Sequence, residues 1–321
     1  MGIRKYANKK CLCGSGKKYK NCCIDKEDDV EFSNPLNFRE SFSKVKKEAR
    51  IKQCLYPDHA TCSERVIGAH SIQNNKILKR ISTNGYVYMP CPKSANPFAG
   101  MSKWGRKEAT VFTGFCGYHD NEVFKPIENN LFDKSDYHCF LYAYRCFAMH
   151  FHKKQESMQI QDAIFKKRPS LITMSDDENP FRGMALAVND FEHVRTAFDN
   201  ALMEESYEIL TNIIWEFPIA SNFAASGFAA PEYDLRNKRI QNLLDATAVI
   251  EHIFITVFPE ADNTYCIISW LKSNDDLFSE LFEQFNLLDI EARKRYINNI
   301  LPITTENIAV NPSSWDAMKS Q

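Results

Sequence analysis

The stretch VIEHIFITVFPEADNTYCIISWL, residues 249–271, decides the fold class of this chain. Both ends of the stretch are apolar runs rich in β-branched and aromatic residues, which favour β-strands. The polar segment PEADNT (259–264) between them is typical of a turn. The stretch therefore predicts a β-hairpin, and EILTNIIWEF (208–217) predicts a further strand.

Helical periodicity surrounds these strands. Apolar residues recur every three or four positions from Tyr137 to Phe151, which predicts one long packing helix. The same spacing predicts a helix from Phe191 to Leu202 and two short closing helices at 277–285 and 296–301. Further short strands are predicted at RVIGAH (65–70) and GYVYM (85–89). Together these elements indicate the α+β class with an antiparallel sheet.

The composition is that of an ordinary globular protein. The 321 residues are 44% hydrophobic, which is enough to bury at least one full core. Lys and Arg total 40 against 41 Asp and Glu, so any nucleic-acid binding must come from local basic patches. No apolar run is long enough to span a bilayer, and the first residues, MGIRKYANKK, lack the apolar segment of a signal peptide. We therefore expect a cytoplasmic protein without membrane contact. The absence of GxGxxG and P-loop patterns argues against dinucleotide-binding and P-loop enzymes.

Cysteine carries the strongest functional signal. The chain has 11 cysteines, an odd number, and eight of them lie in the first 116 residues. In a reducing compartment, cysteines are free thiols or metal thiolates rather than disulfides. The N-terminal third is also poor in long apolar runs, so we expect metal to organise its folding.

Four of these cysteines lie close together in CLCGSGKKYKNCC (11–23), where the glycines allow a tight turn. Four thiolates satisfy a tetrahedral zinc ion. The stretch resembles the SEC-C metal-binding motif, although Leu12 stands where proline is common. The resemblance implies a small zinc-folded knob that docks on proteins or ribosomes. Its predicted ligands are Cys11, Cys13, Cys22 and Cys23.

The charge of the N-terminus changes abruptly after this motif. Residues 1–23 carry seven basic side chains and no acidic one, whereas IDKEDDVE (24–31) is strongly acidic. Such a change marks a small module and its linker. The cations are candidates for contact with the phosphates of nucleic acid. The alternative is a folding staple with solvated lysines.

A second, looser Cys/His cluster follows. The C-x2-H pair of Cys116 and His119 is its firmest part, because that spacing lets both side chains face one ion. Cys54, Cys62 and His70 compete with this pair for four ligand positions, and His59 is a weaker sixth candidate. We expect a second structural zinc ion, with His70 left free. The predicted ligands are Cys54, Cys62, Cys116 and His119.

This second cluster is similar to zinc-bearing HNH nucleases of the His-Me finger class. The resemblance implies that His70 is the general base and that Asp120 or Asn121 binds a catalytic magnesium or manganese ion. The chain departs from the family in three respects. No middle Asn can be placed between His70 and Cys116, and the connection between them is longer than usual. SIQNNKILKRI (71–81) also predicts a helix where the family has a loop and a strand. The block also looks like a group of bacterial proteins of unknown function.

These observations divide the chain into five parts. The parts are a SEC-C knob (1–24), a charged linker with a helix (25–52), a Cys/His zinc core with the long helix (53–165), a linker (166–185) and an α+β domain of unknown role (186–321). The leading hypothesis is a bacterial zinc protein that binds nucleic acid or a nucleoprotein partner. The alternatives are an HNH-like nuclease with His70 as its base, and an adaptor that docks on a protein through the knob without contacting nucleic acid.

Overall fold

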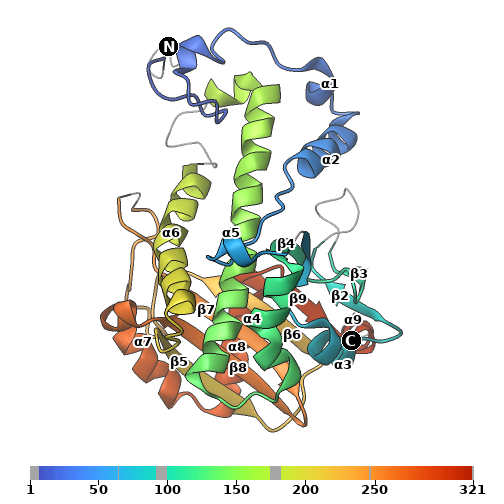
Figure 1. Cartoon of the computed structure of the whole chain (residues 1–321), viewed down its shortest axis with the longest axis vertical. Coiled ribbons are helices and arrows are strands. Elements are labelled where there is room, and N and C mark those ends of the chain that lie inside the picture. Colours follow the sequence, from blue (N-terminus) through green and yellow to red (C-terminus); the bar gives the residue numbers. More distant parts are fainter. Residues whose placement is uncertain (1–6, 64, 92–99, 174–181, 246, 320–321) are drawn as a thin grey trace. The chain divides into compact units, whose positions relative to one another are not determined.

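The structure is a computed structural model that describes residues 7–63, 65–91, 100–173, 182–245 and 247–319 (Figure 1). The chain forms two compact units. The smaller unit contains residues 1–51 and 151–189, and the larger unit contains residues 52–150 and 190–321. Helices α5 (Asp136–Lys167) and α6 (Arg182–Met203) contribute residues to both.

A seven-stranded sheet is the main element of the larger unit. Its order is β3-β2-β9-β6-β7-β8-β5, and its paired strands are antiparallel, which confirms the α+β class. β7 and β8 form the predicted hairpin, in which Ile255 lies opposite Ile268. The strands are β2 (Tyr86–Met89), β3 (Ser102–Gly105), β5 (Leu210–Phe217), β6 (Phe223–Ala229), β7 (Ile253–Glu260), β8 (Asn263–Leu271) and β9 (Ile308–Val310).

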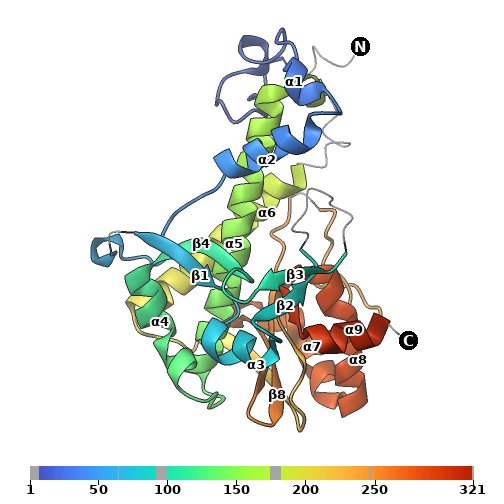
Figure 2. The ribbon, with the colours of Figure 1, turned by 90° about the vertical axis from the view of Figure 1, so that its right-hand side faces the viewer.

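Helices cover both faces of this sheet, because its central strands are apolar on both sides. On one face, Ile255 of β7 joins a core with Trp215 and with helices α7 (Asp275–Leu287) and α8 (Ile290–Thr304). On the other face, the ring of Phe254 packs 5.5 Å from that of Phe198 in α6, which in turn packs 5.3 Å from Phe140 in α5. Figure 2 shows α5 and α8 on opposite sides of the sheet.

The sheet joins segments that the sequence analysis assigned to different domains. β2 and β3 come from the Cys/His segment, yet β2 pairs with β9, where Tyr88 lies opposite Val310. Helix α9 (Pro312–Lys319) follows β9. Residues 53–150 therefore fold in one unit with the C-terminal segment from residue 190 onwards.

A separate two-stranded ribbon leads into the second Cys/His cluster. β1 (Val66–His70) pairs antiparallel with β4 (Val111–Cys116), and helix α4 (Gly117–Asn129) begins directly after β4. The segment after His70 is helical, as predicted, with a π-helical turn (Asn74–Leu78) that continues into α3 (Lys79–Ile81).

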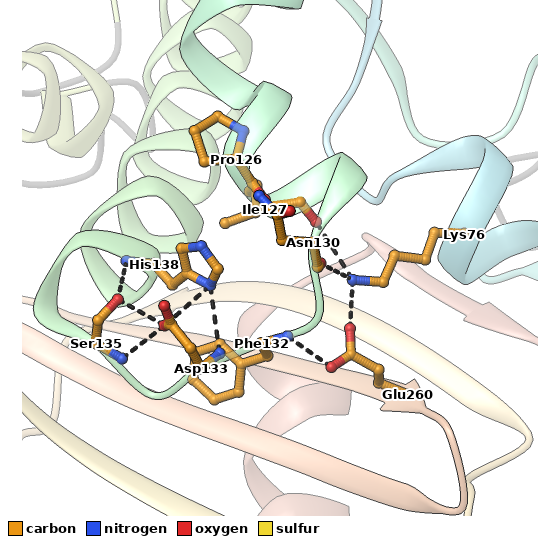
Figure 3. A network of polar contacts seen from close by, with 9 residues as sticks. All are labelled: Lys76, Pro126, Ile127, Asn130, Phe132, Asp133, Ser135, His138 and Glu260. Carbon is orange, nitrogen blue, oxygen red and sulfur yellow. Dashed lines mark hydrogen bonds and ion pairs between the residues drawn. The ribbon is translucent and has the colours of Figure 1, made fainter.

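A polar network ties this helical segment to the central hairpin (Figure 3). Lys76 of the π-helical turn forms an ion pair with Glu260 at the end of β7. The other carboxylate oxygen of Glu260 accepts a hydrogen bond from the backbone N–H of Phe132 at 2.7 Å. The Glu260 side chain is only 5% exposed, so the carboxylate depends on these partners for its stability.

The smaller unit contains the cysteine-rich N-terminus, α1 (Val30–Ser33), α2 (Phe38–Glu48) and the second half of α5. In the predicted linker, α5 runs to Lys167 and a 3-10 helix (Pro169–Thr173) follows; residues 174–181 lie outside the described part of the chain. Asp28 accepts a hydrogen bond from the Ser170 hydroxyl at 2.6 Å. Among the described helices, none combines the length and the apolar character needed to cross a membrane.

Candidate metal centres

The first candidate centre gathers Cys11, Cys13, Cys22 and Cys23, whose sulfur atoms all lie within 4.8 Å of one another. A small turn brings the pairs together: the N–H of Cys11 donates to the carbonyl of Lys17 at 2.7 Å. Gly14 and Gly16 in this turn both have a φ of +71°, which L side chains rarely adopt. A Cβ on Gly14 would also overlap the carboxylate of Asp162, whereas a Cβ on Gly16 would meet open space.

The sulfur geometry fits a tetrahedral ion. The sulfur of Cys22 lies 3.4 Å from that of Cys13 and 3.7 Å from that of Cys23. Four sulfurs at about 2.3 Å from zinc are about 3.8 Å apart, so little movement is needed to bind the metal. Burial opposes ionisation of Cys13, but hydrogen bonds from Ser15 and Cys22 outweigh it and lower the pKa of Cys13 to about 6. Burial raises the pKa of Cys11 to about 11, so metal must displace a proton there.

A small hydrophobic core stabilises the knob in addition to its cysteines. Cys11, Cys13 and Cys23 form a buried cluster with Tyr19 of the knob, Phe165 of α5 and Ile172 of the following 3-10 helix. Phe165 is fully buried. The metal-binding turn therefore belongs to a small core that the end of α5 completes.

The second candidate centre gathers Cys54, Cys62, Cys116 and His119, whose donor atoms also lie within 4.8 Å of one another. Cys116 ends β4 and caps α4, which places His119 in the first turn of that helix. Cys54 is placed beside β4 because its neighbours extend the ribbon: the N–H of Gln53 donates to Thr113 and that of Leu55 to Gly114. Cys62 follows a 3-10 turn (His59–Thr61).

The geometry indicates which imidazole nitrogen would bind the ion. His119 Nδ1 lies 3.3 Å from the sulfurs of Cys54 and Cys116 and 3.6 Å from that of Cys62. Nitrogen and sulfur ligands of one tetrahedral zinc ion are about 3.6 Å apart. Burial lowers the pKa of His119, which favours the neutral imidazole that metals bind. The donor set therefore fits zinc through Nδ1.

Groups outside the ligand set orient this imidazole. With metal on Nδ1, Nε2 carries a proton and donates it to Thr61 Oγ1, 3.0 Å away. The Thr61 hydroxyl in turn donates to the backbone carbonyl of Asp58 at 3.0 Å and contacts its carboxylate at 3.2 Å. The Tyr56 ring stacks on His119 with ring centroids 4.0 Å apart. In the sequence, the only signal for these supporting residues is their place between two cysteines.

The predicted catalytic residues lie outside this ligand set. His70 ends β1, and its Nδ1 lies 3.0 Å from the carbonyl oxygen of Ala109. Burial lowers the pKa of His70 and raises that of Asp120, although the Arg145 guanidinium acts in the opposite sense on Asp120. Asn121 is exposed and donates to Glu122 at 2.7 Å. The described residues contain no third His, Cys, Asp or Glu that completes a metal-binding group with His70 and Asp120.

Comparison with known proteins bears on the first centre. No curated protein and no solved structure matches the chain. Residues 8–24 match the family model described as the SEC-C motif. This stretch includes all four cysteines of the first centre, so the chain carries a SEC-C motif whose cysteines are placed to bind a metal ion.

Proposed function

We propose that this chain is a zinc-stabilised binding protein whose SEC-C knob docks on the phosphates of nucleic acid or of a nucleoprotein. The observation that supports this function is that the lysines of the knob are exposed and that most of them lack an acidic partner in the described part of the chain. Lys9, Lys10, Lys17, Lys18 and Lys20 are all exposed, while the cysteines beneath them are mostly buried.

Most of these lysines have no acidic partner within the described part of the chain. Lys10, Lys17, Lys18 and Lys20 form no ion pair there. Two of the acidic residues that follow the knob have partners elsewhere: Asp28 pairs with Arg168, and Asp29 pairs with Lys167 and caps α1. Lysines that have no acidic partner are available to bind the phosphates of a nucleic acid. Such binding is favourable because it releases the counterions of the phosphates.

The test is the salt dependence of RNA binding. Replacing Lys17, Lys18 and Lys20 with Ala should weaken binding to single-stranded RNA and reduce the slope of log K against log salt by about 2, at about 0.7 per phosphate contact. A matched triple replacement of Lys238, Lys272 and Lys294, which lie in the larger unit, should leave the slope unchanged. Unchanged affinity and slope in the knob variant would refute RNA contact by the knob and favour the protein-docking function.

A second candidate function is metal-dependent hydrolysis of phosphodiesters, which the surroundings of His70 favour. A carbonyl oxygen only accepts hydrogen bonds, so the contact with Ala109 places the proton on Nδ1 and leaves Nε2 as a base. In Asp120, on the first turn of α4, the buried Oδ1 has no hydrogen-bond partner in the described chain. Magnesium is commonly bound by one or two carboxylates with water and substrate phosphate, so Asp120 suits it better than the exposed Asn121.

Nuclease activity is tested with nicking assays on DNA and RNA in magnesium and manganese. We expect His70→Ala to abolish cleavage while both zinc ions stay bound, because His70 is outside the second ligand set. The exposed His59 provides the matched control, since His59→Ala should retain activity. Loss of one zinc ion in His70→Ala would instead identify His70 as a structural ligand, and an inactive wild-type protein would eliminate this function.

A further inference from the structure

A cavity of about 270 Å³ lies beside the second candidate metal centre, entirely within the larger unit. Four separate stretches of the chain line it. They are the loop between Cys54 and Cys62, the first turns of α4, the beginning of α5 and the connection from α6 to β5. The volume is just below the roughly 300–1,000 Å³ of pockets for drug-sized ligands, so a small ligand suits it.

Tyrosine is the main aromatic component of this cavity. Tyr56, Tyr118, Tyr137 and Tyr207 all line it. The rings of Tyr137 and Tyr207 lie 4.4 Å apart and are tilted by 41°, so they do not stack flat on one another. Tyr118 is 50% exposed at the first turn of α4, although its ring already packs against His119. Such rings offer electron-rich faces to a cation.

The charged residues that line the cavity are all acidic, and burial favours the neutral form of the His119 imidazole beside them. Asp58, Glu122 and Glu205 contribute carboxylates, and no Lys or Arg is among the described residues that line it. A zinc ion held by three thiolates and one neutral imidazole would leave one further net negative charge at its edge. After burial, the negative charge of Glu205 is a cause of the raised pKa of both Tyr137 and Tyr207. The described residues that line the cavity therefore carry a net negative charge.

We propose that this cavity binds a small alkylammonium cation, held by tyrosine faces and by the carboxylates around them. Anions are disfavoured by the carboxylates, and a neutral apolar ligand would gain nothing from them. A methylated ammonium group combines a positive charge with an apolar surface, which is the combination that aromatic cages recognise. This site is independent of phosphate binding by the knob.

Choline and its neutral isostere 3,3-dimethylbutan-1-ol provide the test, because they differ mainly in charge. Isothermal titration calorimetry on the full chain should show choline binding about 3- to 30-fold more tightly than the alcohol. Equal affinities for the two compounds, or no saturable binding of choline, would overturn the proposal.

Two matched pairs of variants assign the binding to this cavity. Glu205→Gln should weaken choline binding several-fold, whereas Glu283→Gln, an equal charge change at an exposed position of α7, should not. Tyr207→Leu should lose affinity that Tyr207→Phe retains, because phenylalanine keeps the aromatic face. Zinc content and circular dichroism establish that each variant is folded. Choline binding that both Glu205→Gln and Tyr207→Leu leave intact would place the cation elsewhere and refute this site.

Discussion

The Thr61 hydroxyl should control the affinity of the second centre for zinc. Thr61→Val removes the acceptor of the His119 Nε2 proton while conserving the shape of the side chain. His119 is 2% exposed, so its N–H would lose a partner in a nearly dry environment. Loss of a hydrogen bond that leaves a buried donor unpaired costs about 1–3 kcal/mol. Thr61 itself is exposed and water can partly replace its hydroxyl, so we expect the lower half of that range.

This cost corresponds to about a tenfold loss of zinc affinity, at the low end of the roughly 10- to 100-fold seen when groups behind a ligand are removed. Competition with a chromophoric chelator measures it. Thr61→Ser keeps the hydroxyl and should bind zinc as the unmodified chain does. The four-cysteine centre of the same molecule is an internal control whose affinity should not change.

Two outcomes would refute this reasoning. Unchanged affinity in Thr61→Val would show that the hydroxyl does not support the imidazole. Equal loss at both centres would show a general loss of stability rather than a local effect. With either result, the hydrogen bond to Thr61 would no longer support Nδ1 as the metal-binding nitrogen of His119.

Three further predictions concern a buried ion pair, a pH-dependent pair and the turn of the knob. Glu260→Gln should lower the free energy of unfolding of the larger unit by about 1–3 kcal/mol in urea titrations, because it breaks a largely buried ion pair. Glu216→Gln, in a more exposed pair, should lower it by less than about 1 kcal/mol. Equal losses of stability in the two variants would contradict this prediction. A hydrogen bond to Glu251 raises the pKa of His193, so the pair stabilises the fold at low pH and loses its effect as the pH rises through that raised pKa. The difference in melting temperature between the unmodified chain and His193→Gln should therefore be larger at about pH 5.5 than at about pH 8.5, and a difference independent of pH would count against the pair. Gly14→Ala should impair zinc binding by the knob more than Gly16→Ala. The two glycines have the same backbone conformation, but only at Gly14 would an added Cβ overlap a neighbour, Asp162. Similar losses of zinc binding in the two variants would show that the backbone conformation matters and the overlap with Asp162 does not.

Local sequence patterns predicted the elements with long apolar signals. The hairpin of β7 and β8, the long helix α5 and the helices α7 and α8 are all present where periodicity placed them. β6 was missed because FAASGFA (223–229) is mostly small residues, which give no strand signal. β9 was missed because it has only three residues and is held in place by β2 and β6 from distant parts of the chain.

The candidate sites could likewise be predicted only where their residues lie close together in the sequence. Cysteine spacing was enough to identify the SEC-C motif, because its four thiols lie in one short turn. The ligands of the second cluster are brought together by backbone hydrogen bonds from Gln53 and Leu55 to β4, about 60 residues further along the chain. The spacing of cysteines in the sequence does not predict such long-range hydrogen bonds. The tyrosine-lined cavity is assembled from four stretches of the chain, and no sequence pattern shows that these stretches meet.

The most direct test of the two metal centres is zinc stoichiometry combined with X-ray absorption spectroscopy on the purified chain. We expect close to two zinc ions per chain. Averaged over a site of four cysteines and a site of three cysteines and one histidine, each ion should have about 3.5 sulfur and about 0.5 nitrogen ligands at tetrahedral distances. One zinc ion per chain with four sulfur ligands would contradict the second centre, and a folded chain that binds no zinc would contradict both.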